Sequence, residues 1–340
     1  MSPTAQVDVV VLQHMLNFWD SQGIDIEPIW RVLKLDPTQP LPRWIAAARL
    51  TDVYLFLSDQ GHDLGLLVSA GRYLAQQELP VGRLLRYGSS LEQALPLCFR
   101  FAYLTVGSID FVIENNVTGK CVVVRPQTSC SSLQHQLLLA LATLTHACAE
   151  VLGSDCAATG LRVCLPAEQL NDAHVRQGIN LPMQADNRFA LEISHAAWQR
   201  NNPYQKAELF RHALREFERE HQKFSDYLAL YEELKSILQQ CLLQRHVSQE
   251  DVAESLGISV RNLQRRLKAL GTNYQSLLDE ARKALALRLL QDEATPLYEV
   301  SFMVGYNEPS AFYKAFKRWT GMTPGDYRLA LSQPVTELPS

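Results

Sequence analysis

The cysteine patterns of metal sites and disulfide frameworks are missing from this sequence. Its seven cysteines are scattered, and none forms a CxxC pair. They lie at positions 98, 121, 130, 148, 156, 164 and 241. Scattered cysteines are typical of buried, reduced thiols rather than of disulfides or metal ligands. We therefore expect neither a disulfide framework nor a metal site.

The short motifs of common catalytic sites are missing too. The sequence has no phosphate-binding GxxxxGKS or GxxxxGKT, no GxSxG, no HExxH and no HxH. His135 and His146 are 11 positions apart on one predicted helix. That spacing separates them by about 16 Å along the helix axis, which is too far for one metal ion. We expect no enzyme and no cofactor.

No uninterrupted apolar run of membrane-spanning length occurs, and no basic start is followed by an apolar signal segment. The chain has 340 residues, of which 47% are hydrophobic, enough for two domains with cores of their own. We expect a cytoplasmic protein that does not interact with membranes.

Positive charge is also scarce, and the net charge of −4 alone argues against a nucleic-acid binder. The sign is unevenly distributed, however. Residues 245–328 hold 12 Lys or Arg against 10 Asp or Glu, a net +2 that leaves −6 for the remainder. Screening limits electrostatic attraction to roughly 8 Å, so the acidic remainder does not prevent phosphate binding by this segment.

Helical and strand patterns mix over the first 200 residues. Predicted helices are several short ones within 5–95, then 133–152 and 167–177. Predicted strands are 100–114, 120–126, 160–165 and 188–193, with a hairpin loop at 115–119. The mixture indicates an α+β domain whose helices cover an antiparallel sheet.

Aromatic residues are plentiful early in the chain. They include Trp19, Trp30, Trp44, Tyr54, Phe56, Tyr73 and Tyr87. These side chains could line an effector pocket, but aromatic residues at helical spacing usually belong to the core. The sequence therefore identifies no effector-binding residue.

A break at residues 201–203 precedes a helical pattern crowded with charge. Its apolar stripe consists of Leu209, Phe210, Ala213, Leu214 and Phe217. The stripe can pack on its own domain, which we slightly favour, or on a second subunit. No strand is predicted after this point.

One short pattern occurs twice in the last hundred residues. Val252, Ala253, Leu256 and Gly257 of the first copy correspond to Val300, Ser301, Val304 and Gly305 of the second. A short helix, a glycine turn and a longer helix follow one another in each copy, which is the order of a helix-turn-helix. Two copies in tandem predict a protein that reads two neighbouring stretches of DNA major groove.

Each longer helix separates an apolar seam from a polar edge at 100° per residue. The predicted seams are Leu263, Leu267 and Leu270 in the first helix, and Phe312, Phe316 and Trp319 in the second. The predicted DNA-binding residues are Arg261, Gln264, Arg265, Lys268, Ser310, Tyr313, Lys314, Lys317 and Arg318. Arg suits guanine, Gln suits adenine, and Lys suits phosphate or guanine. Ser259 is predicted to cap the first helix, and Pro309 to begin the second.

A continuous helix over residues 273–291 is predicted between the two copies. At 1.5 Å per residue it spans about 28 Å, close to the roughly 34 Å of one DNA turn. Such a strut could hold both reading helices on one face of a duplex.

Residues 247–328 resemble the tandem helix-turn-helix domain of the AraC/XylS transcription regulators. The resemblance lies in residues 253–259, 261–267, 304–306, 312–317 and 321–328, of which the last two blocks are specific in combination. It covers about a quarter of the 340 residues, or a third with the preceding helix at 227–243.

The resemblance implies a regulator that binds promoter DNA and often recruits RNA polymerase. It assigns base reading to Arg261, Gln264 and Arg265 in the first helix, and to Ser310, Tyr313 and Lys314 in the second. Pro309 and Ala311 stand where relatives often have hydrogen-bonding residues. The second unit is therefore expected mainly to grip phosphates, while the first supplies specificity.

The N-terminal part resembles the mixed helical and sheet sensor of the ornithine-utilisation and mycobacterial virulence subgroup, and not a jelly roll. This implies a small-molecule effector. The predicted parts are an effector-sensing domain at 1–203, a helical linker or dimerisation element at 204–226, a tandem helix-turn-helix domain at 227–331 and a disordered tail at 332–340.

The predicted function is an effector-responsive transcription regulator that acts as an activator and can form a homodimer. One alternative is a constitutive regulator without an effector, whose DNA footprint would not change across a panel of metabolites. The other is an enzyme that uses its DNA-binding module for autoregulation, which turnover of a ligand would indicate.

Overall fold

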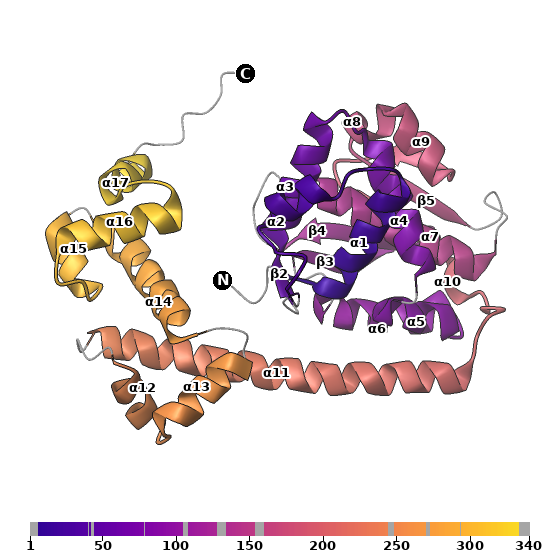
Figure 1. The fold of residues 1–340 in the computed structure, drawn as a ribbon. Coiled ribbons are helices and arrows are strands. Elements are labelled where there is room, and N and C mark those ends of the chain that lie inside the picture. Colours follow the sequence, from indigo (N-terminus) through magenta and orange to yellow (C-terminus); the bar gives the residue numbers. More distant parts are fainter. Residues whose placement is uncertain are drawn as a thin grey trace. The chain divides into compact units, whose positions relative to one another are not determined.

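The computed structural model describes residues 6–39, 41, 44–77, 79–104, 108–127, 134–153, 160–243, 248–269, 273–292 and 294–332. Contacts divide the chain into two units, Met1–Phe224 and Ser225–Ser340. The first unit is α+β, and the second is helical throughout its described residues (Figure 1). Helix α11 (Ala207–Leu243) contributes residues to both units.

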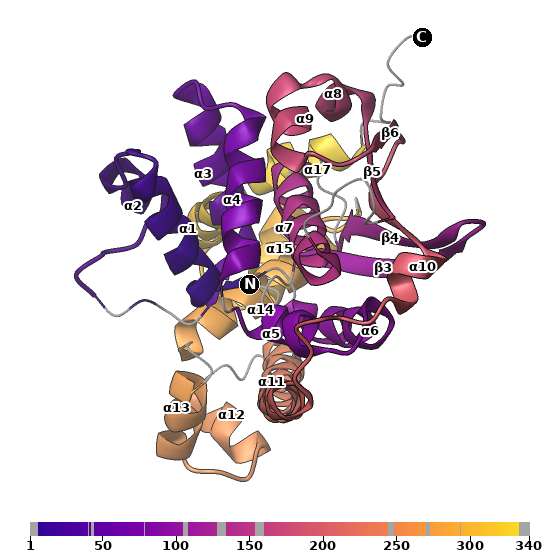
Figure 2. The same ribbon diagram turned by 90° about the vertical axis from the view of Figure 1, so that its right-hand side faces the viewer.

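The N-terminal unit stacks helices over a sheet. Its helices are α1 (Val9–Ser21), α2 (Glu27–Leu33), α3 (Ala47–Asp59), α4 (Leu64–Gln76), α5 (Pro80–Tyr87), α6 (Leu91–Phe101), α7 (Gln134–Leu152), α8 (Ala167–Asn171), α9 (Ala173–Ile179) and α10 (His195–Gln199). Figure 2 shows α7 between α4 and the sheet, and α7 contacts all three of α4, β4 and β7. This α+β architecture confirms the predicted fold class of the N-terminal part.

Five strands form the main sheet in the order β3-β4-β7-β5-β6. They are β3 (Ile109–Asn116), β4 (Gly119–Pro126), β5 (Leu161–Leu165), β6 (Met183–Ala185) and β7 (Phe189–Ser194). All neighbouring pairs are antiparallel except β5 and β6, which are parallel. A separate two-stranded sheet pairs β1 (Gln6–Asp8) with β2 (Trp44–Ala46). The sequence did not predict β1, β2 or β6.

The predicted hairpin is present between β3 and β4. Asn116 pairs with Gly119, so Val117 and Thr118 form the turn inside the expected loop. A Cβ atom at position 119 would lie 2.0 Å from the carbonyl oxygen of Ile193 on β7. Only glycine fits so close to a neighbouring backbone.

The expected strand is wrong at residues 100–104. Helix α6 runs through Phe101, a 3₁₀ turn follows at Ala102–Leu104, and the strand begins only at Ile109. Leu91, Leu95 and Cys98 are buried at helical spacing, which favours continuing the helix. The helix is also capped at its N-terminus, because the backbone amide of Gln93 donates a hydrogen bond of 3.3 Å to the Ser90 hydroxyl.

The single helix expected at residues 167–177 is instead two helices, α8 and α9. Asp172 causes the break. Its carboxylate accepts hydrogen bonds from the amides of His174 (2.9 Å) and Val175 (3.0 Å), which starts a new helix at Ala173.

Helix α7 is the central core helix of this unit. Gly71 of α4 lies so close to it that a Cβ atom there would be 2.7 Å from the Cβ atom of Ala142. By length and composition alone, α7 could cross a membrane, and it is the one such helix among the described residues. It is mostly buried inside the protein, and core helices pass the same test.

The apolar stripe of residues 209–217 packs on its own unit. Phe210, Ala213 and Phe217 of α11 belong to the same buried core as α1, α4 and α7. Leu209 faces away from it, with 43% of its surface exposed.

The described cysteines are free, buried thiols, as predicted: Cys98, Cys121, Cys148, Cys164 and Cys241. Burial raises the pKa of Cys98 to about 12. Cys130 and Cys156 lie outside the described residues.

The C-terminal unit contains α12 (Gln249–Ser255), α13 (Val260–Ala269), α14 (Tyr274–Leu289), α15 (Leu297–Met303), α16 (Pro309–Thr320) and α17 (Pro324–Ser332). The later residues of α11, from Leu234 to Leu242, pack with these helices in a second core. Residues 333–340, most of the predicted tail, lie outside the described part.

Candidate nucleic-acid interface

Helices α12 and α13 are joined by a tight glycine turn. A reciprocal pair of bonds between Ser248 and Asp251 starts α12, since the Asp251 amide donates to the Ser248 hydroxyl and the Ser248 amide to the Asp251 carboxylate, each at 3.0 Å. After α12, Gly257 takes a φ of +62°, and the Ile258 amide bonds the Ala253 carbonyl at 2.9 Å. Positive φ favours glycine here because it has no Cβ.

Helices α15 and α16 repeat this turn 48 positions later. Gly305 has a φ of +84°, and the Tyr306 amide bonds the Ser301 carbonyl at 3.0 Å. The second turn is one residue longer, since α13 begins three residues after its glycine and α16 begins four residues after its own. This insertion explains why the longer helices align at an offset of 49 instead of 48.

Both longer helices begin as the sequence predicts. The Asn262 amide donates a hydrogen bond of 3.3 Å to the Ser259 hydroxyl at the start of α13. Pro309 is the first residue of α16, where its missing N–H is no loss.

The predicted seams are buried. Leu263, Leu267, Phe312 and Phe316 have at most 2% of their surface exposed, and all four belong to the second core. Trp319 packs partly buried against that core, whereas Leu270 lies outside the described residues. The seams fix which edge of each helix faces away from the core.

The polar edge of α13 is exposed, and two of its side chains form hydrogen bonds within the protein. Arg261, Gln264 and Arg265 are all exposed. The Gln264 amide donates to the Gln249 side chain at 3.0 Å, and Arg265 donates to the Asn262 side chain at 3.1 Å. The side chain of Lys268 lies outside the described part.

The edge of α16 carries two exposed lysines, Lys314 and Lys317, together with exposed Ser310. Tyr313 is partly buried, because its ring packs edge-on against Phe312 with centroids 6.0 Å apart. Its packed ring limits how far its hydroxyl can reach.

The remaining predicted contact, Arg318, is already bound within the protein. Its Nη2 lies 2.8 Å from Oδ2 of Asp279 on α14, although 67% of the Arg318 side chain remains exposed. Of the predicted residues on α16, it therefore stands apart from Lys314 and Lys317.

Helix α14 lies between the two helix pairs in sequence, close to its predicted bounds. The Ser276 amide donates a hydrogen bond of 2.9 Å to the Asn273 side chain, which caps it. Its 16 residues span about 24 Å, slightly less than the expected length.

Two cations of α14 bind it to the second helix pair, α15 and α16. Neither was predicted from the sequence. Arg282 donates to the Gly305 carbonyl at 3.1 Å, and its guanidinium lies 4.6 Å from the centroid of the Tyr306 ring. Lys283 donates to the Trp319 carbonyl at 2.9 Å. In the sequence, these two residues are marked only as adjacent cations on a helix whose other face is apolar. Burial raises the pKa of Tyr306, while Arg282 opposes that rise.

Comparison with known proteins identifies this unit. Residues 252–330 match the family described as "Helix-turn-helix domain". The ornithine utilization regulator of Pseudomonas aeruginosa is 48% identical over 81 residues, or 24% of each chain. The C-terminal unit thus contains an AraC-type helix-turn-helix domain. The resemblance to AraC/XylS regulators is confirmed through this AraC-type domain.

Other relatives extend the comparison. The transcriptional regulator VirS of Mycobacterium tuberculosis is 40% identical over 81 residues, 24% of each chain. The chain thus spans about a quarter of the length of these curated relatives. The crystal structure of the transcriptional regulator CdpR from Pseudomonas aeruginosa is 20% identical, with 94% of this chain and 97% of that chain covered and a TM-score of 0.44.

Proposed function

We propose that this protein is a sequence-specific DNA-binding transcription regulator. In this proposal α12–α13 and α15–α16 act as two helix-turn-helix units, with α13 and α16 as the reading helices. The observation that carries it is the AraC-type domain, whose two longer helices bury their apolar seams and leave Arg and Lys side chains exposed. Exposed cations beside a helix that fits the major groove are suited to bind duplex DNA.

The two helix-turn-helix units, α12–α13 and α15–α16, have different roles in this proposal. Arg261, Gln264 and Arg265 read base edges, because Arg and Gln can pair bidentately with guanine and adenine. Lys314 and Lys317, with Lys268, hold phosphates. Ser310 and Tyr313 supply hydroxyl contacts. Pro309 and Ala311 carry no hydrogen-bonding group on their side chains, in keeping with a unit that grips the backbone more than it reads base edges.

Arg318 has a positioning role in this proposal. Its ion pair with Asp279 holds α16 against α14, together with the bonds that Arg282 and Lys283 make. The exposed part of its guanidinium can still face a phosphate. Since α14 spans about 24 Å, it can keep the second unit at a fixed distance within one duplex turn of roughly 34 Å.

The N-terminal unit is proposed to be the effector sensor. Helix α11 is the covalent route from it to the DNA-binding domain, and its first half is anchored on α5 and α6. Arg83 of α5 forms a 3.0 Å ion pair with Glu216, and Phe101 of α6 stacks on Phe217 with centroids 5.3 Å apart. An effector that shifts α5 and α6 would therefore move the root of α11.

Such a shift would change dimerisation or the orientation of the reading helices. The effector must bind the active arrangement more tightly than the inactive one, since equal affinity would shift nothing. Activation of transcription, recruitment of RNA polymerase and a homodimer are the further parts of this proposal.

Sequencing of DNA that co-immunoprecipitates with the protein tests this function, followed by footprinting of the purified full chain on the recovered sites. We expect a short motif common to the recovered sites and a footprint centred on it. Protection that is equal on recovered and random DNA would refute sequence-specific regulation. A footprint unchanged by every member of a metabolite panel would support the constitutive alternative.

A further inference from the structure

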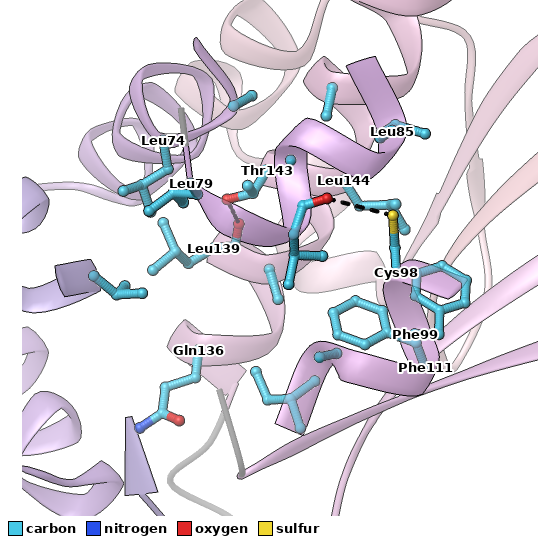
Figure 3. Close-up of a pocket in the computed structure, with 18 of the residues that line it drawn as sticks. Leu74, Leu79, Leu85, Cys98, Phe99, Phe111, Gln136, Leu139, Thr143 and Leu144 are labelled. Carbon is cyan, nitrogen blue, oxygen red and sulfur yellow. Dashed lines mark hydrogen bonds between the residues drawn. The ribbon is translucent and has the colours of Figure 1, made fainter. Parts of the chain in front are cut away.

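A cavity of about 170 Å³ lies inside the N-terminal unit, between helices α3 to α7 and strand β3 (Figure 3). Leucines from α4, α5 and α7 form much of its wall, including Leu74, Leu85 and Leu139. Phe99 of α6 and Phe111 of β3 close one side as a stacked pair, with centroids 4.9 Å apart and planes 3° from parallel. The wall is therefore mainly apolar.

No Asp, Glu, Lys, Arg or His occurs among the described residues that line the cavity. An ion moved into such surroundings loses its hydration and gains no opposite charge, which is strongly unfavourable. Amino acids and carboxylates are therefore poor ligands for this site.

Most polar side chains of the wall are satisfied by the protein itself. Gln136 uses both ends of its amide, accepting from Ser108 at 3.0 Å and donating to the Thr51 hydroxyl at 2.7 Å. Thr143 donates to the Leu139 carbonyl at 2.8 Å, and the Cys98 thiol lies 3.5 Å from the Val81 carbonyl. These groups have little left to offer a ligand.

Tyr54 is the exception. It lines the cavity from α3, its side chain is 2% exposed, and its hydroxyl has no hydrogen-bond partner among the described residues. A buried hydroxyl without a partner costs free energy, so a ligand atom that pairs with it would be favoured.

We propose that this cavity is the effector site, and that it binds a compact, uncharged, mostly apolar molecule with one hydrogen-bonding oxygen or nitrogen that pairs with Tyr54. The effector role rests on the proposed function, whereas the binding chemistry does not. A cavity of about 150 Å³ accommodates benzene, and drug-sized ligands need roughly 300 Å³ or more. The ligand therefore has roughly six to ten non-hydrogen atoms.

The cavity is also placed to affect α11. Val81 and Leu85 of α5 and Cys98 of α6 line it, and the same two helices hold α11 through Arg83 and Phe101. A molecule filling the cavity would press on the same two helices that anchor α11.

Calorimetric titration of the full chain with phenol, toluene and benzoate tests the binding chemistry, because the three are similar in size and differ in polarity and charge. We expect saturable binding of phenol and of toluene, and none of benzoate. Ala140→Leu, which fills the cavity from α7, should abolish both. Benzoate binding as tight as phenol, or no saturable binding of either neutral probe, would overturn the proposal.

Tyr54→Phe tests the hydrogen bond, because it removes only the hydroxyl. Phenol should bind several-fold to about tenfold more weakly, with toluene unchanged. Tyr73→Phe is the matched control, since Tyr73 of α4 does not line the cavity. Tyr54 also borders a cavity of about 20 Å³, which can hold a single water. Unchanged phenol affinity in Tyr54→Phe would mean that the hydroxyl serves that smaller cavity, and would refute its assignment to the ligand.

DNA binding measured in the same samples separates the two proposals. Phenol that saturates the cavity while the operator footprint stays constant would sustain the binding site and overturn its effector role. If the protein binds DNA specifically but binds neither phenol nor toluene, the proposed regulator function is supported and the proposed ligand site is refuted.

Discussion

Arg318 of α16 and Asp279 of α14 form an ion pair across 39 positions of sequence, with Nη2 and Oδ2 2.8 Å apart. Arg282 and Lys283 bind carbonyl oxygens of the second helix pair from the same segment of α14. Three polar contacts therefore connect the proposed spacer to the proposed second reading unit. In the proposed function, a contact of this kind affects DNA binding indirectly, by holding α16 in place.

A double-mutant cycle on Asp279→Ala and Arg318→Ala measures this pair. Because Arg318 is largely exposed, we expect a coupling of only about 0.2 to 1 kcal/mol in the free energy of unfolding, weakened by salt. Asp279→Ala alone should also lower DNA affinity, although removing a negative charge would by itself raise it. Urea unfolding and DNA titration give the two values. Zero coupling together with unchanged DNA affinity in Asp279→Ala would show that Arg318 serves DNA only.

Arg265→Ala removes a proposed base-reading side chain from the exposed edge of α13. Binding to the cognate site should weaken by about 1 to 3 kcal/mol, and base preference at one position should relax. Stability should hardly change, because Arg265 is exposed and its one side-chain bond within the described part of the chain is to Asn262 of its own helix. Titration of cognate and singly substituted duplexes checks this. Equal losses on cognate and random DNA would contradict base reading.

Lys317→Ala removes a proposed phosphate contact from α16. Affinity should fall by a similar factor on every sequence, and the slope of log affinity against log salt should decrease by about one. Arg215→Ala is the control, since Arg215 is an exposed cation on α11 outside the AraC-type domain. The same reduction in both variants would indicate a general charge effect instead of a contact.

Local patterns in the sequence predicted the elements whose side chains repeat at a fixed period. The seams of α13 and α16 followed from Leu263, Leu267, Phe312 and Phe316, and all four are buried. The β3–β4 hairpin followed from two β-branched runs around Gly119. Each of these depends on residues that are near neighbours in sequence.

Features that depend on distant partners were missed. Strand β6 is only three residues long and exists through its parallel pairing with β5. The cavity requires walls from α3 to α7 and β3 at once, so Tyr54 could not be told from the core aromatics around it. The aromatic residues near Phe101 favoured a strand in the sequence. The helix continues to Phe101 instead, because the buried residues of α6 keep their helical spacing up to that point.

Phe217→Ala tests whether α11 is anchored on its own unit. Phe217 is 4% exposed and stacks on Phe101, so its truncation should lower the free energy of unfolding of the N-terminal unit by about 3 to 5 kcal/mol. Leu209→Ala on the exposed side of the same helix should change it by less than about 0.5 kcal/mol. Urea denaturation at several protein concentrations measures both. A Phe217→Ala effect that vanishes on dilution would instead place this stripe in a subunit interface.

Acid sensitivity of the N-terminal unit should depend on His146 of α7. Burial, and then the positive charge of Arg72, lowers the pKa of His146 to about 4. The unfolded chain has a histidine pKa near 6.5, so above that value His146 is neutral in both states and adds no pH dependence. As the pH falls from about 6.5 to 4, only the unfolded chain takes up the proton, and the free energy of unfolding falls by up to about 1.4 kcal/mol per pH unit.

His146→Gln should remove that part of the slope, with urea unfolding at pH 7, 6 and 5 as the measurement. Lowered pKa values also occur at Asp36, Asp186 and Asp292, but these carboxylates lose their contribution only below about pH 4. Between pH 7 and 5 these carboxylates therefore do not change the free energy of unfolding, and its pH dependence there comes from histidine. His62→Gln, at the turn between α3 and α4, controls for the loss of a histidine in itself. If wild type and His146→Gln lose stability equally between pH 7 and 5, the His146 ring takes up its proton in the folded state and its burial does not oppose the charge.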